Sequence, residues 1–144
     1  MNDLKIKIFA DGANVQEIVS MDEQNSVDGF TTNPTLMAQA GIKDYLHFAK
    51  DVLSRVKQKS ISFEVFSDEI EEMYEQAIIL RDLGDNVSVK IPVTNTKGVP
   101  TYELVEKLSN EGVKLNVTAV FTKSQIQNIY NALNPEVNSI ISIF

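Results

Sequence analysis

The chain has 144 residues, of which 43% are hydrophobic and 23% charged, a composition typical of one soluble globular domain. Its net charge of −7 argues against nucleic acid or an anionic membrane as the main partner, and the absence of cysteine excludes disulfides, thiolate metal sites and a cysteine nucleophile. With no apolar run of membrane-spanning length and no apolar leader segment at its start, we expect a cytoplasmic protein.

The first third of the chain alternates strand-like and helical segments. A strand is expected over residues 5–11, followed by a helix that Asn14 opens as part of a capping box. A second strand is expected over 27–33, and Pro34 stands at a favourable first helical position. Apolar residues at spacings of three and four then indicate a longer helix over 45–56.

The next segments follow the same plan. A third strand is expected over 60–66, and Asp68 and Glu71 are candidate caps for the helix after it. Three more strands are expected over 87–93, 114–120 and 139–144. The helices between them are expected to begin near Pro100 and at Thr122. Strands separated by helices throughout predict βα units and a parallel sheet.

Two parallel architectures compete, a doubly wound open sheet and a (β/α)8 barrel. Small or polar residues share one face of each later strand, whereas Ile, Val and Phe occupy the other face. The pairs on the polar face are Ser62 with Glu64, Ser88 with Lys90, Asn116 with Thr118, and Ser142 with Phe144. This pattern favours a barrel with a polar lumen, because an open sheet covered by helices on both sides should be apolar on both faces.

A complete barrel of this kind needs about 200 or more residues. We therefore expect an α/β fold, a (β/α)8 TIM barrel that is incomplete here, with about six βα units in a single partial domain over 1–144 and the last strands missing. We expect these residues to be a piece of a longer protein; the alternative is that neighbouring chains complete the sheet.

Lys90 lies in the middle of the otherwise apolar strand over 87–93. A cation there is costly unless it is paired, neutralised or used chemically. Other strands end in polar residues, among them the carboxylates Asp11 and Glu64, and such a set suits Schiff-base chemistry on a polyhydroxylated carbonyl substrate. The alternatives stay open: a strand-end lysine can extend to solvent, and lone carboxylates often cap helices.

Four segments resemble the transaldolase family, especially its short subfamily, which includes aldolases acting on fructose 6-phosphate. They are Phe-Ala-Asp at 9–11, Gly-Phe-Thr-Thr-Asn-Pro-Thr at 29–35, Val-Lys-Ile-Pro-Val-Thr at 89–94 and Asn-Val-Thr-Ala-Val-Phe at 116–121. The resemblance runs in order along the whole chain, and it implies a (β/α)8 barrel with a class I mechanism that needs no metal or other cofactor.

The resemblance also implies catalytic roles. Lys90 would form a Schiff base with a ketose carbonyl, and Asp11 would accept and return the proton of the hydroxyl next to the bond that breaks. Glu64 and Thr118 would hold and activate the water that helps to form and resolve the carbinolamine.

Further residues would bind substrate. Asn33 and Asn116 would contact oxygens of the dihydroxyacetone unit, and Thr31 would line the pocket. Ser142 matches a pocket serine of the family. Thr31 could equally close a strand–helix turn, and Ser142 could simply line the lumen.

Two positions distinguish activities within the family. Aldolase members tend to have Gln at the position of Glu64 and Tyr at that of Phe144, whereas transferring members have Glu and Phe. A phenol can protonate the enamine and release dihydroxyacetone, and a phenyl ring cannot. The resemblance thus implies a transaldolase of the pentose phosphate pathway; the alternatives are a fructose-6-phosphate aldolase-like enzyme or an inactive barrel fragment that self-associates or binds a partner.

The chain departs from the family at its end. The family places phosphate-binding arginine and serine residues just beyond Phe144 and on the seventh strand, and these are not in the sequence. We therefore expect little activity from the 144 residues alone. For partners we expect sugar phosphates and a homo-oligomer, and neither nucleic acid nor membrane.

Overall fold

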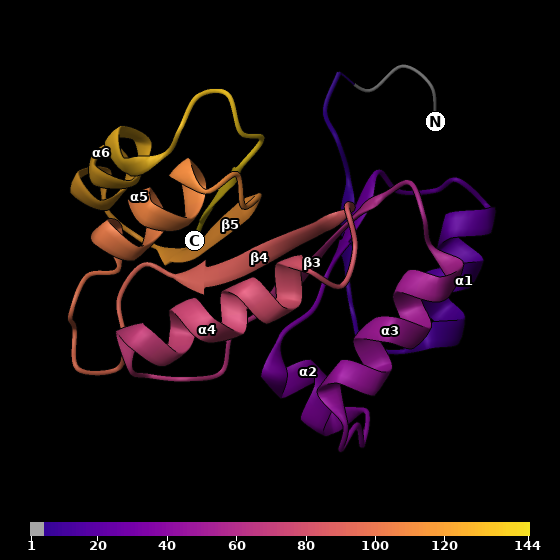
Figure 1. The fold of residues 1–144 in the computed structure, drawn as a ribbon. Coiled ribbons are helices and arrows are strands. Elements are labelled where there is room, and N and C mark those ends of the chain that lie inside the picture. Colours follow the sequence, from indigo (N-terminus) through magenta and orange to yellow (C-terminus); the bar gives the residue numbers. More distant parts are fainter. Residues whose placement is uncertain (1–4) are drawn as a thin grey trace. The chain divides into compact units, whose positions relative to one another are not determined.

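The computed structural model describes residues 5–144, which form six strands and six helices; one helix separates each pair of successive strands except β2 and β3, which are separated by two (Figure 1). The expectation about a leader segment falls mostly on residues 1–4, outside the described part. The strands are β1 (Phe9–Asp11), β2 (Gly29–Thr31), β3 (Ser60–Glu64), β4 (Val87–Pro92), β5 (Leu115–Val120) and β6 (Ile140–Ile143). The helices are α1 (Val15–Glu23), α2 (Pro34–Gln39), α3 (Tyr45–Arg55), α4 (Ile70–Arg81), α5 (Tyr102–Asn110) and α6 (Lys123–Ala132).

The strands follow one another across the sheet in the order β1-β2-β3-β4-β5-β6. The pairings of β1 with β2, β2 with β3, β4 with β5 and β5 with β6 are parallel. A doubly wound sheet would reverse its strand order at a switch point, whereas a (β/α)8 barrel keeps the chain order. The structure confirms the prediction of an incomplete barrel, because six parallel βα units in chain order are those of a half-barrel. Within residues 5–144, no helix combines the length and apolar character that a membrane crossing requires.

The described residues group into two compact units. The first holds the residues up to 63 together with 83–87, and the second holds 64–82 and 88–144. We describe each unit by itself. The prediction of a single domain over 1–144 stays a prediction.

In the first unit, the side chains of β3 alternate between two environments. Phe63 and Ile61 are fully buried, and Phe63 meets the ring of Phe48 of α3 edge to face at 6.4 Å between centroids. Ser62, one residue out of phase, pairs in register with Thr31 of β2. The apolar face of β3 therefore packs toward the helices, as the sequence pattern predicts.

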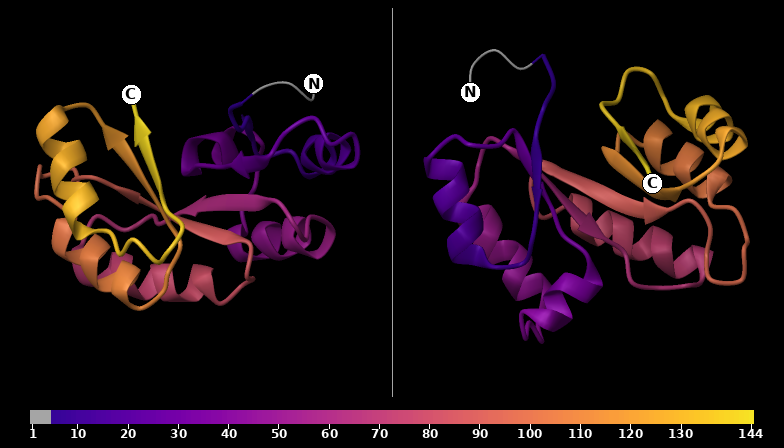
Figure 2. Two further views of the ribbon diagram at one scale, coloured as in Figure 1. Left: turned by 90° about the horizontal axis from the view of Figure 1, so that it is seen from above. Right: turned by 180° about the vertical axis from the view of Figure 1, so that it is seen from behind.

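In the second unit, β4 and β5 have the same alternation. Val89 and Ile91 of β4 are fully buried beside Leu115 and Val117 of β5, while Lys90 pairs in register with Asn116. The helices α5 and α6 lie side by side along this part of the sheet (Figure 2).

Capping residues fix the start of several helices. Asn14, Asn33 and Asp44 each accept backbone N–H groups of the first turn of α1, α2 and α3. Thr122 and Gln125 form the predicted capping box of α6. These contacts satisfy N–H groups that have no partner inside the helix.

The prediction that Asp68 and Glu71 cap α4 is wrong. Glu69 is the N-cap and makes no side-chain cap bond, and Glu71 lies within the first turn. Asp68 instead accepts hydrogen bonds from Thr96, which lies in the loop after β4.

The early strands are shorter than predicted. The strand expected over 5–11 spans only Phe9–Asp11, and Lys5 and Lys7 before it are exposed. The strand expected over 27–33 is limited to three residues, since Asn33 turns to cap the following helix.

Gly29 of β2 is required by close packing. A Cβ atom at this position would lie 2.3 Å from the ring of Phe9 and 2.9 Å from the carbonyl oxygen of Ser60. We predict that Gly29→Ala lowers the free energy of unfolding by about 1–3 kcal/mol, because the ring and the neighbouring strand must shift. Urea denaturation measures the change.

Gly12→Ala is the matched control, because a Cβ there meets no atom within 4 Å and the residue needs no positive φ. We expect Gly12→Ala to leave stability within about 0.5 kcal/mol of the parent chain or to raise it slightly. Equal stability of the Gly29 and Gly12 variants would show that Phe9 yields without cost.

Candidate functional site

The centre of the candidate site is an ion pair in the second unit. Lys90 Nζ lies 3.2 Å from Glu64 Oε2, and the two side chains are 12% and 18% exposed. Glu64 is the last residue of β3, and Lys90 lies two residues before the end of β4. The backbone of Val65 donates to the carbonyl oxygen of Lys90 at 3.1 Å, which holds the two strands in this register.

The carboxylate of Glu64 and the amine of Lys90 form a largely desolvated pair. Removal of both charges from water is costly, and their mutual attraction offsets this cost. The same contact gives the amine a proton acceptor within hydrogen-bonding distance. An amine that exchanges its proton with a neighbouring carboxylate suits nucleophilic attack followed by proton transfer.

Three further predicted residues lie on β5 and β6. Asn116 and Thr118 are buried, at 1% and 4% exposure. Asn116 is the register partner of Lys90, and its Oδ1 accepts a hydrogen bond of 2.7 Å from Ser142 Oγ of β6. Ser142 therefore orients the amide of Asn116, a role that its spacing in the sequence did not reveal.

The strand β5 is irregular next to Thr118. Ala119 has a φ of +58°, and the register between β5 and β6 shifts between Val117 and Val120. A left-handed conformation costs energy at a residue with a Cβ, and such bulges often lie beside functional sites.

Phe144 follows β6 and lies at its exposed edge. Its side chain is 71% exposed, and its ring centroid is 5.9 Å from that of Phe121. The backbone N–H of Phe144 donates to the carbonyl oxygen of Val120 at 2.9 Å.

The first unit holds the other three predicted residues. Thr31 Oγ1 donates a hydrogen bond of 2.8 Å to Asp11 Oδ1, and the two residues are paired in register at the ends of β1 and β2. Asn33 Oδ1 accepts from the backbone N–H of Leu36 at 2.9 Å. The structure thus brings Asp11 and Thr31 together, and it gives Asn33 a helix-capping contact.

Two loops in the second unit show contacts that sequence reasoning missed. Gln76 Oε1 accepts from the backbone N–H groups of Phe66 and Ser67 after β3, at 2.7 and 3.1 Å. Asp68 accepts from the backbone and the side chain of Thr96, both at 2.7 Å. These bonds join segments distant in sequence, so no local pattern indicates them.

Two side chains in these loops have shifted pKa values. The backbone and side-chain hydrogen bonds from Thr96 lower the pKa of Asp68, and the nearby charge of Lys97 acts in the same direction. The pKa of Lys97 is raised by its hydrogen bond to Glu69 and by the charge of that carboxylate.

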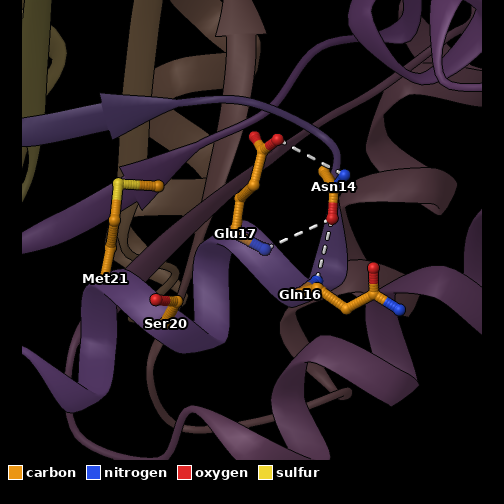
Figure 3. A pocket seen from close by; sticks show the side chains of 5 residues that line it. All are labelled: Asn14, Gln16, Glu17, Ser20 and Met21. Carbon is orange, nitrogen blue, oxygen red and sulfur yellow. Dashed lines mark hydrogen bonds between the residues drawn. The ribbon is translucent and has the colours of Figure 1, made fainter.

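A hollow of about 530 Å³ lies along α1, and none of the predicted site residues is among the residues that line it. Its lining residues belong to the helix and its cap, as Figure 3 shows, and they are Asn14, Gln16, Glu17, Ser20 and Met21. Because one helix face supplies the whole lining, the hollow gives no convergent set of functional groups. Within residues 5–144, no group of three or more histidine, aspartate or glutamate side chains is placed to hold a metal ion.

Comparison with known proteins identifies the family. Residues 8–144 match the family described as Transaldolase/Fructose-6-phosphate aldolase. The chain belongs to this family. The match covers β1 to β6 and every predicted site residue of this transaldolase/aldolase chain, which confirms the resemblance seen in its sequence.

Curated relatives share about two fifths of the aligned residues. A protein of Dehalococcoides mccartyi described as "Probable transaldolase" is 38% identical over 120 residues, which are 83% of this chain and 54% of the relative. A protein of Coprothermobacter proteolyticus with the same description is 41% identical over 120 residues, covering 83% and 52%. The chain spans about half the length of the curated relatives it matches.

A solved structure supports the fold. The wild-type sialic acid aldolase of Ruminococcus gnavus superposes with a TM-score of 0.63 at 12% identity, over 96% of this chain and 55% of the aldolase. At this identity the likeness concerns the fold alone.

The Glu64–Lys90 pair makes a prediction about stability. We expect Glu64→Gln and Lys90→Met each to destabilise the chain, because each leaves the opposite charge in a largely desolvated position. The double variant should be more stable than the sum of the single changes predicts, by about 1–3 kcal/mol. Urea denaturation of the four proteins gives this coupling energy, and additivity within about 0.5 kcal/mol would show that the contact contributes nothing.

Proposed function

We propose that this chain supplies the Schiff-base part of a class I transaldolase, which transfers a dihydroxyacetone unit between sugar phosphates. The observation that supports the proposal most directly is the 3.2 Å contact between Lys90 and Glu64 at neighbouring strand ends, in a chain of the transaldolase/aldolase family. A largely desolvated lysine beside a proton acceptor is an arrangement that suits imine chemistry.

The proposed reaction begins at Lys90. Its amine transfers a proton to Glu64, the neutral nitrogen attacks the ketose carbonyl carbon, and a second proton then passes from that nitrogen to the former carbonyl oxygen to give the carbinolamine. Return of the first proton from Glu64 to the carbinolamine hydroxyl releases water and leaves a protonated imine between Lys90 and the substrate. Because proton removal and proton return are both needed, an acid–base group within 3.2 Å of the nitrogen serves both steps.

Neighbouring residues of the second unit would bind the sugar and the water. Thr118 is proposed to hold the catalytic water together with Glu64. Asn116 is proposed to contact an oxygen of the dihydroxyacetone unit through its amide. The hydrogen bond that its Oδ1 accepts from Ser142 fixes the orientation of this amide.

Residues of the first unit complete the proposal. Asp11 would take the proton of the hydroxyl beside the bond that breaks, and the hydrogen bond from Thr31 at 2.8 Å orients its carboxylate. Asn33 would bind a substrate oxygen with its side-chain N–H groups, since its carbonyl oxygen already accepts from Leu36.

Glu64 and Phe144 favour transfer over simple aldol cleavage. After cleavage the three-carbon enamine must either be protonated or attack an aldehyde acceptor. The ring of Phe144 offers no proton, so the enamine would persist until glyceraldehyde 3-phosphate or erythrose 4-phosphate arrives. We further propose that the protein works in the cytoplasm without a cofactor and as a homo-oligomer.

Borohydride trapping tests the reactive lysine. We predict that fructose 6-phosphate with borohydride converts Lys90 to a stable secondary amine, because hydride reduces the imine. Intact mass and peptide mapping locate the adduct. Lys90→Met should abolish it.

Lys97→Met is the matched control. Lys97 is 63% exposed, whereas Lys90 is 12% exposed, so Lys97→Met should leave the adduct on Lys90 unchanged. Adducts spread over exposed lysines, or none on a folded chain, would contradict the proposal and favour an inactive fragment with a binding role.

A steady-state assay tests the need for further strands. We predict that the 144 residues have little transaldolase activity, whereas a version extended at its C-terminus by the remaining strands of a relative is active. The reason is that remote phosphate binding helps to position the reacting carbons. Equal rates for the two proteins would contradict this, and dihydroxyacetone release without an aldehyde acceptor would assign the extended protein to the aldolases.

A further inference from the structure

The loops after β3 and β4 are joined by a set of hydrogen bonds that we call the Asp68 clamp. Both carboxylate oxygens of Asp68 accept from Thr96, one from the backbone N–H and one from the hydroxyl, each at 2.7 Å. The carbonyl oxygen of Asp68 accepts from Asn95 Nδ2 at 3.1 Å. These three bonds connect the loop after Glu64 to the loop after Lys90.

The loop after β4 is itself ordered around Asn95. This side chain is 8% exposed, and its Oδ1 accepts from the backbone N–H groups of Lys97 and Val99 at 3.0 and 2.9 Å. Thr101 at the far end of the loop donates its hydroxyl proton to the carbonyl oxygen of Pro92 at 2.7 Å. The loop therefore returns to the end of β4 as a closed and internally bonded unit.

The loop after β3 is held from its other side. Gln76 of α4 accepts from the backbone N–H groups of Phe66 and Ser67. Ser67 Oγ accepts from the N–H of Glu69 at 3.2 Å and donates to a carboxylate oxygen of Glu72 at 2.5 Å. Asp68 thus projects from a loop that α4 already fixes.

We propose that Asp68 is a positioning residue for the reaction of Lys90. A backbone bond from Val65 to Lys90 joins the two segments at the end of β3, and the clamp joins the loops that follow. By preventing the two strand ends from separating, the clamp keeps Glu64 Oε2 at 3.2 Å from Lys90 Nζ. This inference rests on the proposed function, in which that distance governs proton exchange.

The charge of Asp68 strengthens the clamp. The groups that face it are Thr96 and the cation of Lys97, which is itself paired with Glu69 at 2.6 Å. Since these contacts lower the pKa of Asp68, the stabilisation is complete above the pKa of an unfolded aspartate. It is lost as the pH falls through the lower pKa of the folded chain.

The first test measures stability and does not depend on a reaction of Lys90. The Glu64–Lys90 coupling energy is measured again by urea denaturation, with Asp68→Ala added to the parent chain, to Glu64→Gln, to Lys90→Met and to the double variant. We expect it to fall by about half or more, because the two side chains no longer share a fixed separation. An unchanged coupling energy would overturn the inference, whether or not Lys90 forms an imine with a ketone.

The second test measures the rate of imine trapping with dihydroxyacetone and cyanoborohydride. We expect Asp68→Ala to lower the limiting rate about tenfold with little change in the half-saturating ketone concentration. The reason is that a displaced Glu64 carboxylate slows imine formation and does not alter the binding of the ketone. Asp68→Asn keeps a carbonyl oxygen that accepts from Thr96 N–H, so it should lose only about two- to threefold.

Variants of Thr96 make the test independent of Asp68. Thr96→Val removes the hydroxyl and should behave like Asp68→Asn, whereas Thr96→Ser keeps the hydroxyl and should retain most of the rate. Arg55→Gln is the control, because its exposed ion pair with Asp51 lies outside both loops and is expected to matter little. If Asp68→Ala fails to fold, the Asn and Val variants decide.

The outcomes separate the two proposals. If the parent chain and the folded Asp68→Ala variant are trapped on Lys90 at equal rates, the proposed role of the clamp is refuted and the proposed function stays intact. A parent chain that never traps would refute the proposed function, while the coupling energy still shows whether the clamp sets the Glu64–Lys90 distance.

Discussion

Parallel strands end at a common edge of their sheet, and this constraint places Glu64 of β3 beside Lys90 of β4. Neither charge would be favourable there alone, since each is mostly removed from water. The alternation along the strands sets the rest: Ile61, Phe63, Val89 and Ile91 are buried, so the residues between them must face the other side. The same alternation of side chains therefore buries the apolar face and places Glu64 beside Lys90.

A polar inner face is stable only when its groups find partners. Among the described residues, every buried side-chain nitrogen and oxygen has a hydrogen-bond partner, as native interiors require. The Ser142–Asn116 bond and the bond from the hydroxyl of Thr32 to the carbonyl of Ser62 are examples. Such bonds also leave each side chain with one defined orientation, which is what recognition of sugar hydroxyls needs.

Local patterns predicted the parts of the structure that local physics determines. Period-two alternation gave β3 to β6, and capping chemistry gave the start of α1 and α6. Asp68 was misassigned because an aspartate before a helix looks like a cap, and its partner Thr96 is 28 residues away. Gln76 was missed for the same reason. Lys90 could be recognised because a cation inside an apolar strand is anomalous within its own segment.

The proposed function assigns different tasks to different parts of a barrel. Imine formation needs a desolvated amine and a proton acceptor, and in the proposal the adjacent strands β3 and β4 supply both. Discrimination among sugars needs contacts far from the carbonyl, which a barrel gathers from the loops of its later strands. The chain spans about half the length of its curated relatives, at 52–54%. The contact between the amine and the carboxylate lies within β3 and β4, and we therefore propose that an aspartate in the loop after β3 controls their separation.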